Sequence, residues 1–195
     1  MHEILTKEYI NQFAGYLAEK IENYGGSKEN PAKLLEVGAG DGRLSYFLNR
    51  KLNKLVPGKF NLVATDSGEE VRIKPVFDVE KIDYKAALKK YSPTIVISSW
   101  MPAGVDWTSD FRSEPSVKEY ILVGPPFDAT CGDMSLTWGE EEFYNDETGK
   151  IEYKEEQPPY EKDGFELDFL GGNYQRSWIE SMGAHSSTVI FIRKK

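Results

Sequence analysis

Three closely spaced glycines form the feature of this chain that points most directly to chemistry. Gly38, Gly40 and Gly42 follow the mostly apolar run 34–37, and a helical pattern begins at Arg43. Glycine adopts positive φ at low cost and lets another group approach the bare backbone closely. A buried strand that turns through such a loop into a helix is typical of nucleotide binding, so we expect a nucleotide-like ligand at this loop. The alternative is a glycine-rich turn that holds no ligand.

The spacing of these glycines separates two kinds of nucleotide loop. A dinucleotide-binding fingerprint has glycine at its first, third and sixth positions, whereas the sixth position here is Arg43. Glu36 stands two residues before the first glycine. This pattern resembles the first motif of class I S-adenosylmethionine-dependent methyltransferases. The resemblance implies S-adenosyl-L-methionine as cofactor, with Glu36, Gly38, Ala39 and Gly40 at the loop that packs against its methionine and ribose portions.

A second acidic residue supports nucleoside binding. Asp66 ends the second expected strand and is followed by Ser67 and Gly68. A carboxylate at this place can accept hydrogen bonds from adjacent ribose hydroxyls. Methyltransferases and nicotinamide enzymes both use an acid here, so Asp66 and Ser67 predict a nucleoside site without choosing between the two classes. The alternative is an exposed Asp in a turn.

The resemblance extends to two further strand ends. Asp78 and Val79 match by position the family's acid that faces the adenine amine and the apolar residue that covers the ring; a loop acid facing solvent is the alternative. Ser98 follows the fourth strand, beside the family's sulfonium and methyl acceptor. The run 98–102, Ser-Ser-Trp-Met-Pro, departs from the Asn-Pro-Pro-Tyr tetrad of amino-group DNA methyltransferases, which leaves the acceptor chemistry open.

Three residues near this strand end are candidates for catalysis. Ser99 can orient a substrate, and Trp100 can stack on a planar or cationic group, although it can equally be a core aromatic residue. Asp106 is the candidate for a base if the acceptor is an oxygen. The connection 105–112 is rich in aromatic and charged residues. It reads either as a specificity loop or as a helix start capped by Asp106 or Thr108.

Strands and helices alternate along the chain in a way that places these residues at one edge of a sheet. We expect helices at 6–24, 43–55, 84–91, from 114–115 onward and at 174–182, and strands at 33–37, 60–66, 73–77, 94–99, 120–123, 165–170 and 187–192. This order predicts an α/β fold with right-handed crossovers and a doubly wound sheet whose ligands bind at the carboxyl ends of its strands. The resemblance implies a Rossmann-like sheet of about seven strands, mostly parallel with an antiparallel last strand. The order of the last two strands is left open.

The alternation breaks down after Gly124. We expect one methyltransferase-like domain over 1–195 with a loop-rich acidic insertion at about 132–164, and a short hairpin around 148–150.

Composition argues against several classes of partner. The formal net charge of −8 argues against broad binding to nucleic acid or anionic membranes, both of which need clustered Lys and Arg. Cys131 is the single cysteine, and the start of the chain lacks a signal-peptide pattern, so a cytoplasmic location is expected. Two histidines and one cysteine make no recognisable zinc pattern, so no metal is expected.

Three functions remain open. The first is a methyltransferase that acts on a small-molecule or protein acceptor. The second is a non-catalytic relative of the same fold that binds the nucleoside, or no ligand, and serves as an interaction module whose acidic insertion contacts a protein partner. The third, a nicotinamide oxidoreductase, is opposed by Arg43 at the sixth loop position. The sequence predicts no oligomeric state.

Overall fold

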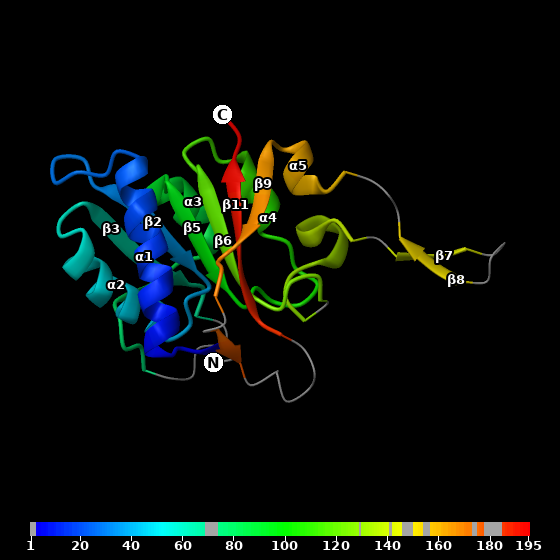
Figure 1. The fold of residues 1–195 in the computed structure, drawn as a ribbon, viewed down its shortest axis with the longest axis horizontal. Coiled ribbons are helices and arrows are strands. Elements are labelled where there is room, and N and C mark those ends of the chain that lie inside the picture. Colours follow the sequence, from blue (N-terminus) through cyan, green and yellow to red (C-terminus); the bar gives the residue numbers. More distant parts are fainter. Residues whose placement is uncertain are drawn as a thin grey trace.

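A seven-stranded mixed sheet forms the centre of the protein (Figure 1). The computed structural model describes residues 3–68, 74–128, 130–140, 142–145, 150–153, 157–172, 175–177 and 185–195. The sheet order is β4-β3-β2-β5-β6-β11-β9. Its strands are β2 (Ala32–Val37), β3 (Phe60–Asp66), β4 (Val79–Lys81), β5 (Ile95–Ser99), β6 (Glu119–Gly124), β9 (Phe165–Phe169) and β11 (Ser187–Arg193).

One strand of this sheet runs against the others. Strands β4, β3, β2, β5 and β6 pair in parallel, whereas β11 pairs antiparallel with both β6 and β9. The predicted Rossmann-like fold with an antiparallel last strand is therefore confirmed. The order of the last two strands is also settled, because β11 inserts between β6 and β9.

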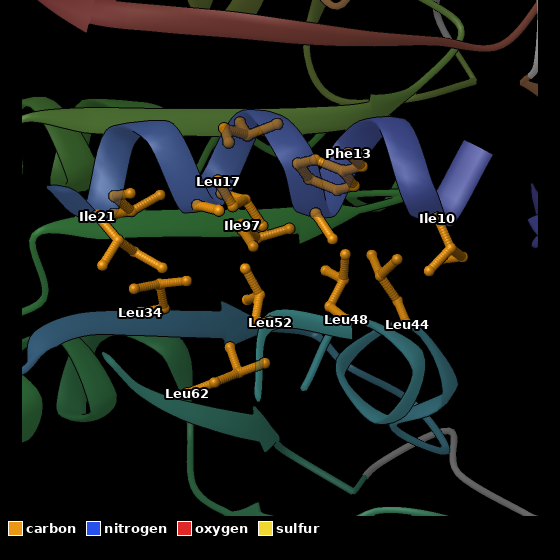
Figure 2. Close-up of a cluster of buried hydrophobic side chains, with 14 of the residues drawn as sticks. Ile10, Phe13, Leu17, Ile21, Leu34, Leu44, Leu48, Leu52, Leu62 and Ile97 are labelled. Atoms are coloured by element: carbon orange, nitrogen blue, oxygen red, sulfur yellow. The ribbon is translucent and has the colours of Figure 1, made fainter. Parts of the chain in front are cut away.

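Two helices cover one face of the sheet. Helix α1 (Lys7–Asn23) begins where the Thr6 side chain accepts a hydrogen bond from the Tyr9 N–H, and α2 (Arg43–Leu55) begins directly after the glycine loop. Figure 2 shows apolar side chains of both helices meeting those of three strands. The residues labelled there are Ile10, Phe13, Leu17, Ile21, Leu34, Leu44, Leu48, Leu52, Leu62 and Ile97. Burial of such side chains contributes about 1.5–3 kcal/mol each, so this layer anchors the glycine loop at both of its ends.

The other face carries shorter elements. They are α3 (Tyr84–Tyr91), α4 (Thr108–Ser113), the π-helical turn η1 (Met134–Trp138) and α5 (Pro159–Lys162). The pleat of β5 separates the two layers, since Ile95 and Ile97 pack with α1 and α2 while Val96 packs with the opposite cluster. Trp138 and Tyr160, both from the predicted insertion, are buried in this second cluster. The range 132–164 therefore contributes to the core as well as to the surface.

Two small antiparallel sheets lie outside the main one. Strand β1 (Glu3–Ile4) pairs with β10 (Arg176–Ser177), and β7 (Glu142–Asn145) pairs with β8 (Lys150–Tyr153). The β7–β8 pairing confirms the predicted hairpin, although its tip, 146–149, lies outside the described residues. Figure 1 shows this hairpin extending away from the main sheet.

Three predicted elements are wrong. The third strand is not at 73–77: residue 73 lies outside the described residues, 74–78 are not strand, and β4 occupies 79–81. No helix begins near 114–115, because α4 ends at Ser113 and Pro115 follows it in a turn. Within the predicted helix 174–182, Arg176 and Ser177 form a strand, and the other residues except Gln175 lie outside the described ones.

Among the described residues, no helix combines the length and the apolar character needed to cross a membrane.

Candidate functional site at the carboxyl edge of the sheet

The glycine loop lies at the carboxyl end of β2 and uses each glycine differently. Gly38, Gly40 and Gly42 have φ values of +64°, +57° and +74°, a region that other residues enter at a cost of about 1–2 kcal/mol. A Cβ atom on Gly42 would stand 2.8 Å from side-chain atoms of Phe77 and Val79, whereas a Cβ on Gly40 would meet nothing within 4 Å. Gly42 therefore serves packing, and Gly40 borders open space.

Asp66 joins this loop to the neighbouring strand. Its Oδ2 accepts a hydrogen bond from the Gly40 N–H at 2.9 Å, and its Oδ1 accepts one from the Gly68 N–H at 2.7 Å. The residue is half-buried, and Ser67 beside it is exposed. A carboxylate has about four lone-pair sites, so each oxygen can accept one more hydrogen bond. Asp66 thus combines a fixed position against the loop with capacity for a ligand hydroxyl.

Glu36 connects the strand before the glycine loop to the helix after it. The residue is 2% exposed, and its Oε2 accepts hydrogen bonds from the backbone N–H and the hydroxyl of Ser45 in α2. Burial raises the pKa of the Glu36 carboxyl to about 7, and the charges of Asp41 and Asp66 act in the same direction, while the Ser45 hydrogen bonds oppose the rise. Ala39 is held in turn by its N–H, which donates to the carbonyl of Thr65 at 2.9 Å. Glu36 and Ala39 therefore fix the shape of the turn.

Asp78 and Val79 do not lie at the end of a strand, where the sequence predicted them. Val79 pairs with Ala64 at the start of β4, so the strand begins where it was expected to end. Asp78 is exposed, and Val79 packs against the loop at Gly42. The segment still borders the loop, because the Val76 N–H donates to the Asp41 carbonyl at 2.8 Å. The placement of Asp78 and Val79 at the end of the third strand is therefore wrong, and their role beside an adenine ring stays a prediction.

The end of β5 brings Ser98, Ser99 and Trp100 to the same edge. Ser98 is 1% exposed, and its hydroxyl is buried without a hydrogen-bond partner among the described residues. Ser99 is half-buried. Trp100 has a φ of +59°, and its N–H donates to the Val123 carbonyl at 2.7 Å. Such a conformation persists in a non-glycine residue only where its surroundings fix it.

Glu3 fixes Trp100, and sequence reasoning missed it. The indole Nε1–H of Trp100 donates to Glu3 Oε2 at 3.1 Å, and the hydroxyl of Ser186 donates to the same oxygen at 2.6 Å. Glu3 is 4% exposed. No local pattern marks a residue whose partners lie 97 and 183 positions away.

Asp106 caps a helix. Its Oδ1 accepts hydrogen bonds from the N–H and hydroxyl of Thr108, and Oδ2 accepts one from the Ser109 N–H. The Thr137 hydroxyl of η1 also donates to Oδ1, at 3.0 Å. Burial raises the pKa of this carboxyl, but the hydrogen bonds outweigh burial and leave the pKa below its ordinary value. The structure therefore favours the helix-start alternative for 105–112 and disfavours Asp106 as a proton acceptor.

Trp107 lies on the glycine loop, a contact that the sequence did not reveal. Its Cζ3 and Cη2 atoms stand 3.0 and 3.1 Å from the point where a Cβ of Gly38 would be. The indole stacks on Tyr84 with ring centroids 4.8 Å apart and an interplanar angle of 22°. The loop after β5 and the start of α3 are thereby packed against the end of β2.

Comparisons with known proteins bear on the fold. No protein-family model matches the chain, and no curated protein matches it. Among solved structures, the CMeT domain of the citrinin polyketide synthase aligns with a TM-score of 0.52 and 14% identity, over 96% of this chain and 52% of that one. The CurJ carbon methyltransferase aligns with a TM-score of 0.51 and 14% identity, over 96% of this chain and 55% of that one. The chain thus spans about half the length of these two structures.

A third structure has a different reaction in its name. The S-adenosylmethionine-dependent O-methyltransferase of Thermotoga maritima aligns with a TM-score of 0.48 and 8% identity, over 99% of this chain and 67% of that one. The fold of this chain is that of the class I S-adenosylmethionine-dependent methyltransferases. At these identities the likeness extends to the fold alone.

Proposed function

We propose that this chain is an S-adenosylmethionine-dependent methyltransferase that acts on a small-molecule or protein acceptor. The observation that carries the proposal is the contact between Gly40 and Asp66. It sets a carboxylate with spare acceptor capacity beside a stretch of backbone that faces open space. The carboxylate can accept hydrogen bonds from the two adjacent hydroxyls of a ribose. The bare backbone lets the rest of a nucleoside approach closely.

The residues at this edge fit S-adenosyl-L-methionine as the nucleoside. Asp66 would hold the ribose, and the loop at Gly40 would lie against the cofactor. The Ser98 hydroxyl, on the strand next to β2, is buried and has no partner in the described part of the chain, and a ligand can satisfy a polar atom of this kind. When bound, this cofactor supplies a methyl group that its sulfonium charge has already activated.

The contribution of the chain to methyl transfer would be alignment and exclusion of water. Ser99 and the Trp100 backbone lie where β5 ends and would orient the acceptor. Both carboxylate oxygens of Asp106 already accept hydrogen bonds from α4 or η1. The proposal therefore includes no protein base. A nitrogen or carboxylate acceptor, which presents a lone pair without losing a proton first, fits such a site best.

Isothermal titration of the chain with S-adenosylmethionine and with S-adenosylhomocysteine tests the cofactor. We expect both to bind, with one ligand per chain. If neither ligand gives a heat of binding at millimolar concentration, the proposal is wrong. NADH serves as the comparison ligand, because binding of NADH alone would favour the oxidoreductase alternative.

A second candidate function has its own observation. The β7–β8 hairpin extends away from the sheet that carries the site (Figure 1), which suits a protein-binding module of the same fold. Incubation with methyl-labelled S-adenosylmethionine and a fractionated cell extract separates the two. Label on a small molecule or a protein supports the enzyme, whereas cofactor binding without any transfer favours the module.

A further inference from the structure

The order of the strands gives a bound nucleoside one direction across the site. Asp66 ends β3, the glycine loop follows β2, and β5 lies on the far side of β2. A ligand whose ribose lies at Asp66 and whose body crosses the loop at Gly40 therefore reaches toward the end of β5. Gly38 is the first loop residue on that path, and the ring that touches Gly38 belongs to Trp107.

Two contacts fix the indole of Trp107 in this place. Tyr84 stacks on one face, and Gly38 meets the benzene edge. The backbone of the residue is held separately, because its amide N–H donates to Met101 Sδ at 3.4 Å. Tyr84 is itself held, because its hydroxyl donates to Asp110 Oδ2 at 2.9 Å. Trp107 as a whole residue is half-buried, so it is not enclosed by these contacts. An anchored aromatic residue that is not enclosed beside a ligand loop is suited to a direct contact with the ligand.

The chemistry of this surface selects for positive charge. An indole attracts a cation more strongly than any other side-chain ring, and the attraction increases when water is excluded. Behind the stack, the Asp110 carboxylate is paired with Lys85 Nζ at 3.3 Å, so the attraction for a cation comes from the indole ring itself. An uncharged sulfur also contacts an aromatic ring favourably, but it lacks the additional attraction between a cation and the ring.

We propose that Trp107 is the residue by which the site prefers the charged methyl donor over its neutral product. This inference rests on the proposed function. In the transfer, the lone pair of the acceptor forms the new bond to the methyl carbon, and the electron pair of the broken carbon–sulfur bond stays on sulfur. Sulfur thereby loses its positive charge, and the attraction to the indole falls at the same moment. Trp107 therefore assists exchange of product for a new donor.

Titration of Trp107→Leu and Trp107→Phe with both ligands tests the proposal. The measured quantity is the ratio of the Kd of S-adenosylhomocysteine to that of S-adenosylmethionine. We expect Trp107→Leu to lower this ratio by about three- to tenfold, and Trp107→Phe to lower it less, because a phenyl ring retains part of the attraction. Phe169→Leu, an exposed aromatic on the edge strand β9, is the matched control and should leave the ratio unchanged.

The outcomes are distinct. Equal weakening of both ligands by Trp107→Leu, or no weakening, overturns the selectivity role while leaving the proposed function intact. Failure of the unaltered chain to bind either ligand overturns both. If Trp107→Leu does not fold by circular dichroism, Trp107→Phe decides alone, and an unchanged ratio in that variant counts against the proposal.

Discussion

The Gly40 N–H and the Asp66 carboxylate are 2.9 Å apart, and this hydrogen bond joins the loop after β2 to the end of β3. The two strands pair in parallel from Ala32 and Phe60 up to Val37 and Thr65. The contact therefore continues the register of the sheet to its carboxyl edge, where the ligand site is proposed. Asp66 has two tasks in consequence: it shapes the loop and it would hold the ribose.

Replacement of Asp66 by Ala should weaken both ligands together. A hydrogen bond to a charged group contributes about 1.5–3 kcal/mol, so the Kd values of S-adenosylmethionine and S-adenosylhomocysteine should each rise by at least about tenfold. Isothermal titration measures both. Asp168→Ala, which removes an exposed acid of β9, is the control and should leave both Kd values as they are. Unchanged affinity in Asp66→Ala would contradict the ribose assignment.

Alanine at two loop positions should separate stability from binding. Gly42→Ala places a methyl group 2.8 Å from atoms of Phe77 and Val79 and should destabilise the fold by about 1–3 kcal/mol beyond the backbone strain. Gly40→Ala meets nothing within 4 Å and should cost only the strain of about 1–2 kcal/mol. Its methyl group enters the space proposed for the cofactor, so affinity should fall instead. Urea unfolding and titration of both variants measure the contrast, and equal stability losses would contradict it.

The buried carboxyl of Glu36 should make stability depend on pH. Its pKa is raised from 4.5 to about 7 in the folded state, so the native protein holds this proton more tightly than the unfolded chain. The contribution of Glu36 to stability is therefore greatest below about pH 4.5 and falls as pH rises to about 7, by about 3 kcal/mol in total.

Glu36→Gln removes that titration. The free energy of unfolding of the unaltered chain, relative to that of Glu36→Gln, should fall between about pH 5 and pH 8. Urea unfolding of both chains at the two pH values measures the difference. A difference that is constant across this range would show that Glu36 is ionised at the same pH in both states.

Loss of the Asp106 side chain should unravel the start of α4. Asp106→Ala removes the acceptor of the Thr108 and Ser109 N–H groups and the link to Thr137. A cap of this kind contributes about 0.5–2 kcal/mol, and urea unfolding measures the loss. Asp106→Asn retains the Oδ1 acceptor and should be milder.

Asp106→Asn also tests Asp106 as a base. Once a methyl acceptor is identified, the transfer rate of Asp106→Asn should show the same pH profile as that of the unaltered chain. A profile that loses its rise with pH would restore the catalytic assignment.

The parts of the site that could be predicted from sequence are those whose signal is local. Gly38, Gly40 and Gly42 stand within five residues of each other and follow an apolar strand, so backbone geometry and position in the sheet are both readable. The position of Asp66 at a strand end was predictable for the same reason, because it follows a strand pattern with the apolar centre 62–64. The β7–β8 hairpin was predicted from the turn-forming sequence at 148–150.

The elements and site residues that the sequence did not predict are very short strands and contacts between distant residues. Strand β4 has three residues, too few for a periodic pattern, and Pro75 within the run predicted instead was a sign against a strand there, because proline cannot donate to a ladder. Strand β10 has only two residues and forms against the distant β1. Glu3 and Trp107 act through contacts between residues far apart in the chain, which only the folded structure brings together.

The pairing of β1 with β10 and the course of β11 decide where a label can be attached. Glu3 lies against Trp100 at the carboxyl edge of the sheet, so a tag or fusion partner joined ahead of it would lie beside the proposed acceptor site. Strand β11 runs the other way, with Ser187 opposite Gly124 and Ile192 opposite Glu119, and it carries the chain to the opposite edge (Figure 1). Attachment after Lys195 therefore keeps a label away from the proposed site, which suits immobilisation and the screening of acceptors.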